Sequence, residues 1–112
     1  MSDRYTKSIR KKLSQLASIA YERELDQELE KLGQRFDNWR NRKIDGFELN
    51  DLIHKFHQGT SRDVWKTYNY LDADMVVSRA IVIGLLKKEE IPEDLLETIK
   101  SHIDFWKNRI KV

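Results

Sequence analysis

Three side chains that could bind a metal ion lie close together near the middle of the chain. Asp51, His54 and His57 are spaced three residues apart, and in a helix the first two share one face. Asp-x-x-His has the spacing of half a carboxylate-bridged di-metal site, which needs a second such pair and two further carboxylates. The remaining histidine, His102, has Ile99 three residues before it, so the second half is absent. We therefore expect no metal and no other cofactor, with one histidine bonded between helices and one on the surface.

The motifs of nucleophilic and phosphate chemistry do not occur in the sequence. There is no Gly-x-Ser-x-Gly, and the four glycines are isolated, which excludes Gly-x-Gly-x-x-Gly and Gly-x-x-x-x-Gly-Lys. The chain has no cysteine, hence no thiol nucleophile and no disulfide. These absences predict a protein that is not an enzyme, in a reducing compartment such as the cytoplasm.

Residues 47–71 have the outline of a helix–turn–helix. Two helical stretches flank Gly59, which we place in the turn, and the second stretch would expose Arg62 and Lys66. Asp63 near the start of that second helix would repel phosphate, which weakens the case for DNA reading.

A second basic cluster surrounds Trp39 and could contact a nucleic-acid backbone. Its members are Arg35, Arg40, Arg42 and Lys43. The net charge of only +2 is too small to favour nucleic acid by itself. A small DNA-associated transcriptional regulator, using the 47–71 hairpin and the basic helix ends, is therefore the alternative function.

All these residues have to be positioned by helices. Apolar residues recur every three to five positions from Tyr5 to Trp39, which predicts one long helix over about residues 3–40, with Ser2 as its N-cap. Gly33 is the one position at which this helix could break. At about 1.5 Å per residue, such a helix must overhang the rest of a chain of this size.

Shorter helices follow. Asp45 is the expected cap of the second one and Gly59 its end. Residues 74–88 are apolar on all sides, which predicts a central helix, and a final helix starts with Pro92 at its first position. Seven aromatic residues at helical spacing are expected in the core: Phe36, Trp39, Phe56, Trp65, Tyr68, Phe105 and Trp106.

Length and composition agree with this outline. A chain of 112 residues predicts a single domain, here 1–112, formed by the long helix 3–40 and a compact helical bundle over 45–112. The 36% of charged residues suits solvated helix faces. The longest apolar run is far below the ~20 residues of a spanning helix, so we expect no membrane insertion. The predicted fold class is all-α, a small bundle of about five helices.

Charges on the long helix are grouped by sign. Residues 3–12 hold five cations against one acid, net +4, and residues 22–30 hold five acids against one cation, net −4. An antiparallel pair of these helices would place opposite blocks together, whereas a parallel pair would place like charges together. We therefore expect a homodimer whose seam is formed by Ile9, Leu13, Leu16, Ala17 and Ala20.

The sequence thus predicts a non-enzymatic small helical protein that self-associates as a homodimer and acts as a protein–protein interaction module. A further protein partner is compatible with this function, and its identity is not encoded in any motif.

Overall fold

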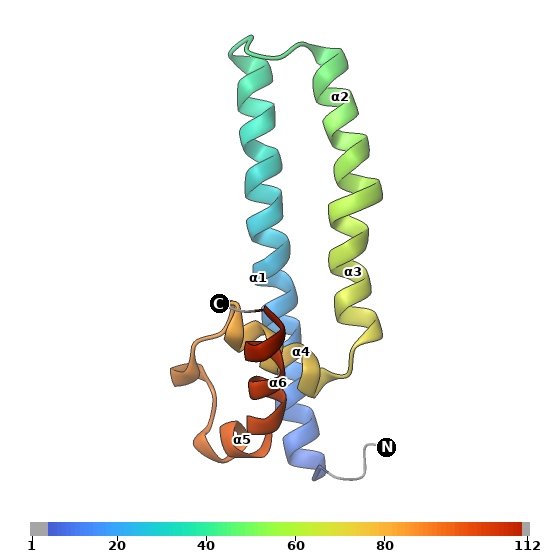
Figure 1. The fold of residues 1–112 in the computed structure, drawn as a ribbon. Helices are drawn as coiled ribbons and strands as arrows, with labels where there is room; N and C mark the ends of the chain where they lie inside the picture. Colours follow the sequence, from blue (N-terminus) through green and yellow to red (C-terminus); the bar gives the residue numbers. More distant parts are fainter. Residues whose placement is uncertain (1–4, 111–112) are drawn as a thin grey trace.

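The computed structural model describes residues 5–110 and contains helices and loops but no strand in that range, which confirms the all-α prediction (Figure 1). Its α-helices are, in chain order, α1 Lys7–Arg40, α2 Gly46–Lys55, α3 Ser61–Tyr70, α4 Ala73–Val82, α5 Glu93–Thr98 and α6 Lys100–Ile110. A π-helical turn, Phe56–Thr60, joins α2 to α3, and a short 3-10 turn, Lys88–Glu90, precedes α5.

The first helix is a single unbroken rod of 34 residues, as predicted, and runs through Gly33. Its N-cap is Thr6, whose hydroxyl accepts the backbone N–H of Ile9 at 3.1 Å. The predicted cap, Ser2, lies outside the described residues. At about 1.5 Å per residue α1 is about 51 Å long, close to the 53 Å length of the whole molecule.

No turn separates α2 from α3, so the predicted helix–turn–helix of residues 47–71 is wrong. Thr60 keeps helical dihedrals, φ −57° and ψ −50°, and the backbone N–H of Ser61 donates to the carbonyl of Phe56, five residues earlier. This i→i+5 bond accommodates one extra residue as a π-bulge. Gly59 therefore lies inside a continuous helical segment, because glycine lowers helix propensity without enforcing a turn.

The continuous α2–α3 segment runs back along the overhanging half of α1. We call residues 24–40 of α1 together with residues 46–70 the arm; it occupies the upper part of Figure 1. Only Leu49 and Val64 are fully buried on its α2–α3 side. The structure thus places residues 46–70 beside the long helix and not in the compact bundle expected over 45–112.

The other end of the molecule is a helical bundle formed by the first half of α1 with α4, α5 and α6. Helix α4 packs against both α1 and α6 and is the most buried helix, as predicted, with Val77, Ser78 and Ala80 fully inaccessible. The bundle core contains Leu13, Leu16, Ala20, Val77, Ala80, Leu85, Leu86, Ile91, Leu95, Ile99 and Ile103.

Two helix boundaries differ from the prediction. Helix α4 ends at Val82 and not at residue 88, because Gly84 has φ +87°, a left-handed conformation that terminates the helix. In the C-terminal part, Pro92 is the N-cap of α5 and not its first residue. The chain bends at Ile99, with φ −105° and ψ 16°, so the predicted final helix is divided into α5 and α6.

The prediction that the seven aromatic residues are core residues holds only in part: Tyr68 packs against the bundle core, and Phe36, Phe56 and Trp106 are half-buried. None of them is fully buried, and Trp39, Trp65 and Phe105 are 40–50% exposed, at 43%, 48% and 43%. The radius of gyration is 17.3 Å, against about 13 Å for a compact domain of this length, so the molecule is elongated. Trp39 and Trp65 are exposed because they belong to an arm only two helices thick, which has no second layer to cover large side chains. No helix within residues 5–110 is both long and apolar enough to cross a membrane.

Candidate functional site

The residues predicted to form the dimer seam belong to the bundle core. Leu13, Leu16 and Ala20 are 2%, 2% and 0% exposed, and Ile9 and Ala17 pack against the same core. The seam assigned to these residues is therefore already covered by the chain's own helices. Helical periodicity identified the buried face of α1 correctly. It could not show whether that face is buried by helices of the same chain or by a second copy.

The Asp51, His54 and His57 group is spread over an exposed helix surface. Asp51 forms an ion pair with Lys55 at 3.0 Å, and both histidines are exposed. Between residues 5 and 110 no three His, Cys, Asp or Glu side chains are grouped so as to hold a metal ion. The histidine bonded between helices is His102, so the expectation that one of the first two has this role is wrong.

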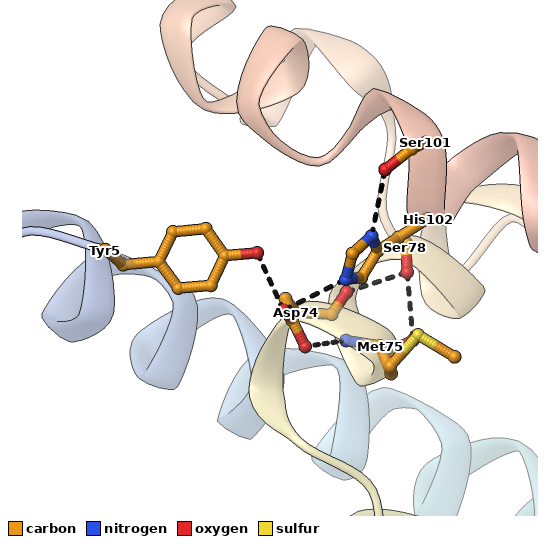
Figure 2. A network of polar contacts seen from close by, with 6 residues as sticks. All are labelled: Tyr5, Asp74, Met75, Ser78, Ser101 and His102. Carbon is orange, nitrogen blue, oxygen red and sulfur yellow. Dashed lines mark hydrogen bonds and ion pairs between the residues drawn. The ribbon is translucent and has the colours of Figure 1, made fainter. Parts of the chain in front are cut away.

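His102 lies in a polar network that joins three helical segments (Figure 2). Its Nε2 lies 3.1 Å from Oδ2 of Asp74 at the start of α4, and the Tyr5 hydroxyl donates to the same oxygen at 2.7 Å. On the other side of the ring, Nδ1 lies 3.3 Å from the Ser101 hydroxyl. Because the carboxylate is acceptor only, Nε2 is the ring nitrogen that carries a proton toward it.

Ser101, His102 and Asp74 follow one another in this network in the order of a nucleophilic triad. Asp74 is only 8% exposed, and its other oxygen accepts the backbone N–H of Met75 at 2.7 Å. Its backbone carbonyl accepts the hydroxyl of the fully buried Ser78. The carboxylate therefore has bonds to Tyr5, Met75 and His102, and these connect α6 and the segment before α1 to the start of α4.

A second polar cluster connects the arm to the bundle. Glu24 of α1 accepts two bonds from the Arg79 guanidinium, at 3.0 and 3.2 Å, and one from the Tyr68 hydroxyl at 2.7 Å. The Tyr68 ring stacks on Tyr21 with centroids 4.6 Å apart. Burial opposes ionisation of Glu24, but the bonds from Arg79 and Tyr68 prevail and lower its pKa. Burial and then the Glu24 carboxylate raise the pKa of Tyr68, so this phenol stays protonated.

A third cluster fixes the loop after α4. Arg23 donates to both oxygens of Glu90, at 2.9 and 2.8 Å, and to the carbonyl of Leu85 at 2.9 Å. The hydrogen bond from Arg23, followed by the bond from the backbone N–H of Lys87, lowers the pKa of Glu90 to about 2. Within the segment 22–30 of α1, Glu24 and its neighbour Arg23 therefore have ion-pair partners in the same chain.

The basic cluster lies at the tip of the arm, where α1 turns into α2. Asp45 caps α2 as predicted, accepting the backbone N–H of Glu48 at 2.8 Å. A surface hollow of about 600 Å³ lies here, lined by Trp39, Arg40, Arg42, Lys43, Ile44, Asp45, Gly46 and Glu48. The tip thus brings together three of the four predicted basic residues with an aromatic ring.

The other two predicted nucleic-acid contacts are separate from the tip. Arg62 and Lys66 are exposed on α3, and Arg62 lies 16 residues beyond the start of α2, about 24 Å along a helix. The structure therefore does not combine the two basic groups into one surface.

Sequence reasoning missed all three polar clusters, because their partners are 28 to 69 residues apart. A lone histidine or a glutamate in an acidic run carries no local signal of such a partner. Comparison of the chain with family models, with curated proteins and with solved structures finds no match.

Proposed function

We propose that this chain is a non-enzymatic interaction protein that works as a homodimer, joined through one exposed face of α1 in the arm. A cytoplasmic location, expected from the absence of cysteine, is part of the same proposal. One observation carries it: an exposed leucine and an exposed glycine lie one turn apart on a helix face with opposite charges at its two ends.

That face consists of positions spaced by three, four and seven residues, which share one side of a helix. They are Glu22, Asp26, Leu29, Gly33 and Arg40, and all are exposed. Leu29 leaves 49% of its surface uncovered, and a Cβ placed on Gly33 would have no neighbouring atom within 4 Å. The leucine is a projection and the glycine a shallow depression on the same surface.

A second copy, packed antiparallel with its axis of symmetry between these two positions, fits both. Residue i then faces residue 62 − i, so Leu29 of each copy lies on Gly33 of the other, and small residues permit close approach of helices. The same register places Glu22 opposite Arg40 at each end. Parallel packing would place Glu22 against its own copy, and like charges facing each other are unfavourable.

The incomplete burial of apolar side chains in the arm supports packing against a second copy. Leu25, Leu32 and Phe36 are only half-buried between the two helices of one arm. A second arm laid against the first would build a four-helix arrangement, which covers apolar side chains on two sides of each helix. The dimer proposed here uses other residues of α1 than the seam predicted from sequence and retains the antiparallel orientation.

The test is the mass of the protein in solution from micromolar to submillimolar concentration. We expect a dimer for the unmodified chain and a monomer for Gly33→Gln, because the new side chain occupies the position of Leu29 of the second copy. Glutamine favours helix over glycine by several tenths of a kcal/mol or more, so loss of the dimer cannot be attributed to unfolding.

Gly59→Gln, on the other helix of the arm, is the matched control and should remain dimeric. A monomeric mass for the unmodified chain overturns the proposal, and so does a dimer that tolerates both Gly33→Gln and Leu29→Gln.

A further inference from the structure

Arg42 occupies a backbone position that normally belongs to glycine. Its φ is +63°, the one positive value at a non-glycine residue between 5 and 110. The backbone N–H of Lys43 donates to the carbonyl of Asn38 at 2.8 Å, and that of Arg42 donates to Trp39 at 3.0 Å. This is the Schellman arrangement, in which the left-handed residue after the helix is usually glycine and sometimes asparagine. An arginine here costs stability compared with glycine.

Strained residues often lie at functional positions, and an observed outlier is a reason to search for a role. Since the backbone position favours glycine, the feature that distinguishes Arg42 here is its guanidinium side chain.

Two exposed aromatic residues lie within five positions of Arg42 in the sequence. Phe47, in the first turn of α2, is 89% exposed, and Trp39, in the last turn of α1, is 43% exposed. Trp39 also lines the hollow of about 600 Å³ together with Arg42 and Lys43. Large apolar rings exposed to this extent at one place mark a binding surface more often than isolated exposed residues do.

Three cations line the hollow at the tip, Arg40, Arg42 and Lys43, against two acids, Asp45 and Glu48, so its net charge favours an anionic ligand. Asp37 is already bound to Arg40 at 2.9 Å, and the Asp45 side chain is used as the cap of α2. Within the described part of the chain no carboxylate forms an ion pair with Arg42 or Lys43. Their cationic groups are therefore available to a ligand that brings its own negative charge.

Cations interleaved with exposed rings are typical of surfaces that bind single-stranded nucleic acid, where phosphates meet the cations and unpaired bases stack on the rings. A duplex supplies the phosphates but hides the faces of its bases, so the rings would gain nothing from it. An acidic peptide would use the cations alone.

We propose that the tip of the arm binds single-stranded nucleic acid without sequence preference, with Arg42 and Lys43 on the phosphates and Trp39 and Phe47 as stacking surfaces. This proposal does not rest on the homodimer, because Trp39, Arg42, Lys43 and Phe47 are not among the positions of the proposed dimer face.

The test measures fluorescence anisotropy of a labelled oligothymidine at low salt while the full chain is added. We expect saturable binding. The logarithm of the association constant should fall linearly with the logarithm of the salt concentration, with a slope of about −1.4, because two phosphates contribute about −0.7 each. Arg42→Gly should weaken binding by about fivefold or more and at the same time raise the melting temperature. A role that was only structural would not give these opposite changes.

Matched controls come from the same arm. Arg62→Ala removes an exposed arginine of α3 and should leave binding unchanged. Trp39→Leu keeps an apolar side chain and should weaken binding by about tenfold, since stacking of one base contributes about 1–3 kcal/mol, while Trp65→Leu should not. Gly33→Gln should bind as the unmodified chain does, which separates this test from that of the dimer.

Three results would overturn the proposal. The first is no saturable binding of the oligothymidine, and the second is binding that Arg42→Gly leaves unchanged. The third is equally tight binding of a duplex or of polyglutamate, which would assign the tip to charge alone and remove the role of the rings.

Discussion

Three carboxylates carry most of the polar contacts between distant parts of the chain. Asp74, Glu24 and Glu90 each accept bonds from at least two donors on other segments or on the backbone. Such bonds are charge-assisted and roughly twice as strong as neutral ones. At the scale of single residues, the pKa values of Glu24 and Glu90 are lowered by these bonds, so both contacts depend on an ionised carboxylate.

Replacing Glu90 by glutamine should make stability less dependent on pH. The pKa of Glu90 is about 2 in the folded protein, below the value of about 4.3 in an unfolded chain. Its contribution is therefore complete above about pH 5 and is lost as the pH falls toward about 2. We expect Glu90→Gln to lower the melting temperature at neutral pH and to leave it unchanged near the acidic limit.

The measurement is thermal unfolding followed by circular dichroism over this pH range. Glu97→Gln, at an exposed position of α5, is the control and should follow the unmodified chain. Parallel curves for Glu90→Gln and the unmodified chain would contradict the prediction.

At the scale of helices, a glycine can either end a helix or lie within one, depending on its backbone conformation. Gly84 terminates α4 with φ +87°, whereas Gly59 lies within a continuous helical segment. A Cβ at either position would have no atom within 4 Å, so only backbone conformation distinguishes them.

Gly84→Ala should therefore lower the free energy of unfolding by about 1–2 kcal/mol, while Gly59→Ala should raise it by about 0.5–1 kcal/mol. Chemical denaturation of the two variants measures both changes in the free energy of unfolding and so checks their opposite signs. Destabilisation by Gly59→Ala would indicate that the chain bends at this glycine in solution, as the sequence alone suggested.

The helices themselves were largely predictable, because their signals are local. The apolar spacing of α1 and the capping residue Asp45 lie within a few residues of the feature that they determine. The bend at Ile99 and the π-helical turn have no comparable local signal, since each depends on the surfaces against which the helix packs. The apolar spacing of Leu13 and Leu16 likewise indicates that one face of the helix is buried, but it does not indicate which segment covers that face.

The candidate sites were less predictable for the same reason. The basic cluster around Trp39 was found because its members are neighbours in sequence. Its separation from Arg62, and the meeting of Asp74 with His102, follow from the course of the whole chain. Long-range placement of this kind has no counterpart in residue spacing.

At the scale of the whole molecule, buried contacts are unevenly distributed. The core cluster lies in the bundle, while α2 and α3 contribute only Leu49 and Val64 as fully buried apolar residues. Local opening of a structure is easier where few apolar contacts must be broken. The arm should therefore open without unfolding of the bundle.

Amide hydrogen exchange measures this difference directly. We expect the amides of Val76–Ala80 in α4 to exchange most slowly, and those of α2 to exchange faster by at least tenfold, a difference of about 1.4 kcal/mol in opening free energy. Equal protection of α2 and α4 would contradict a two-part distribution of stability.

The long first helix belongs to both ends of the molecule, and this has a consequence for the order in which a growing chain can fold. Only a short loop separates the end of α1 at Arg40 from the start of α2 at Gly46. Helix α2 can therefore pack against α1 as soon as it leaves the ribosome. The apolar side of residues 9–20 must wait for segments some sixty to ninety residues later, Val77 to Ile103. Contacts between such distant residues form slowly. During synthesis that side therefore stays exposed until α4 to α6 have been made, and exposed apolar surface of this kind is where a growing chain is prone to aggregate.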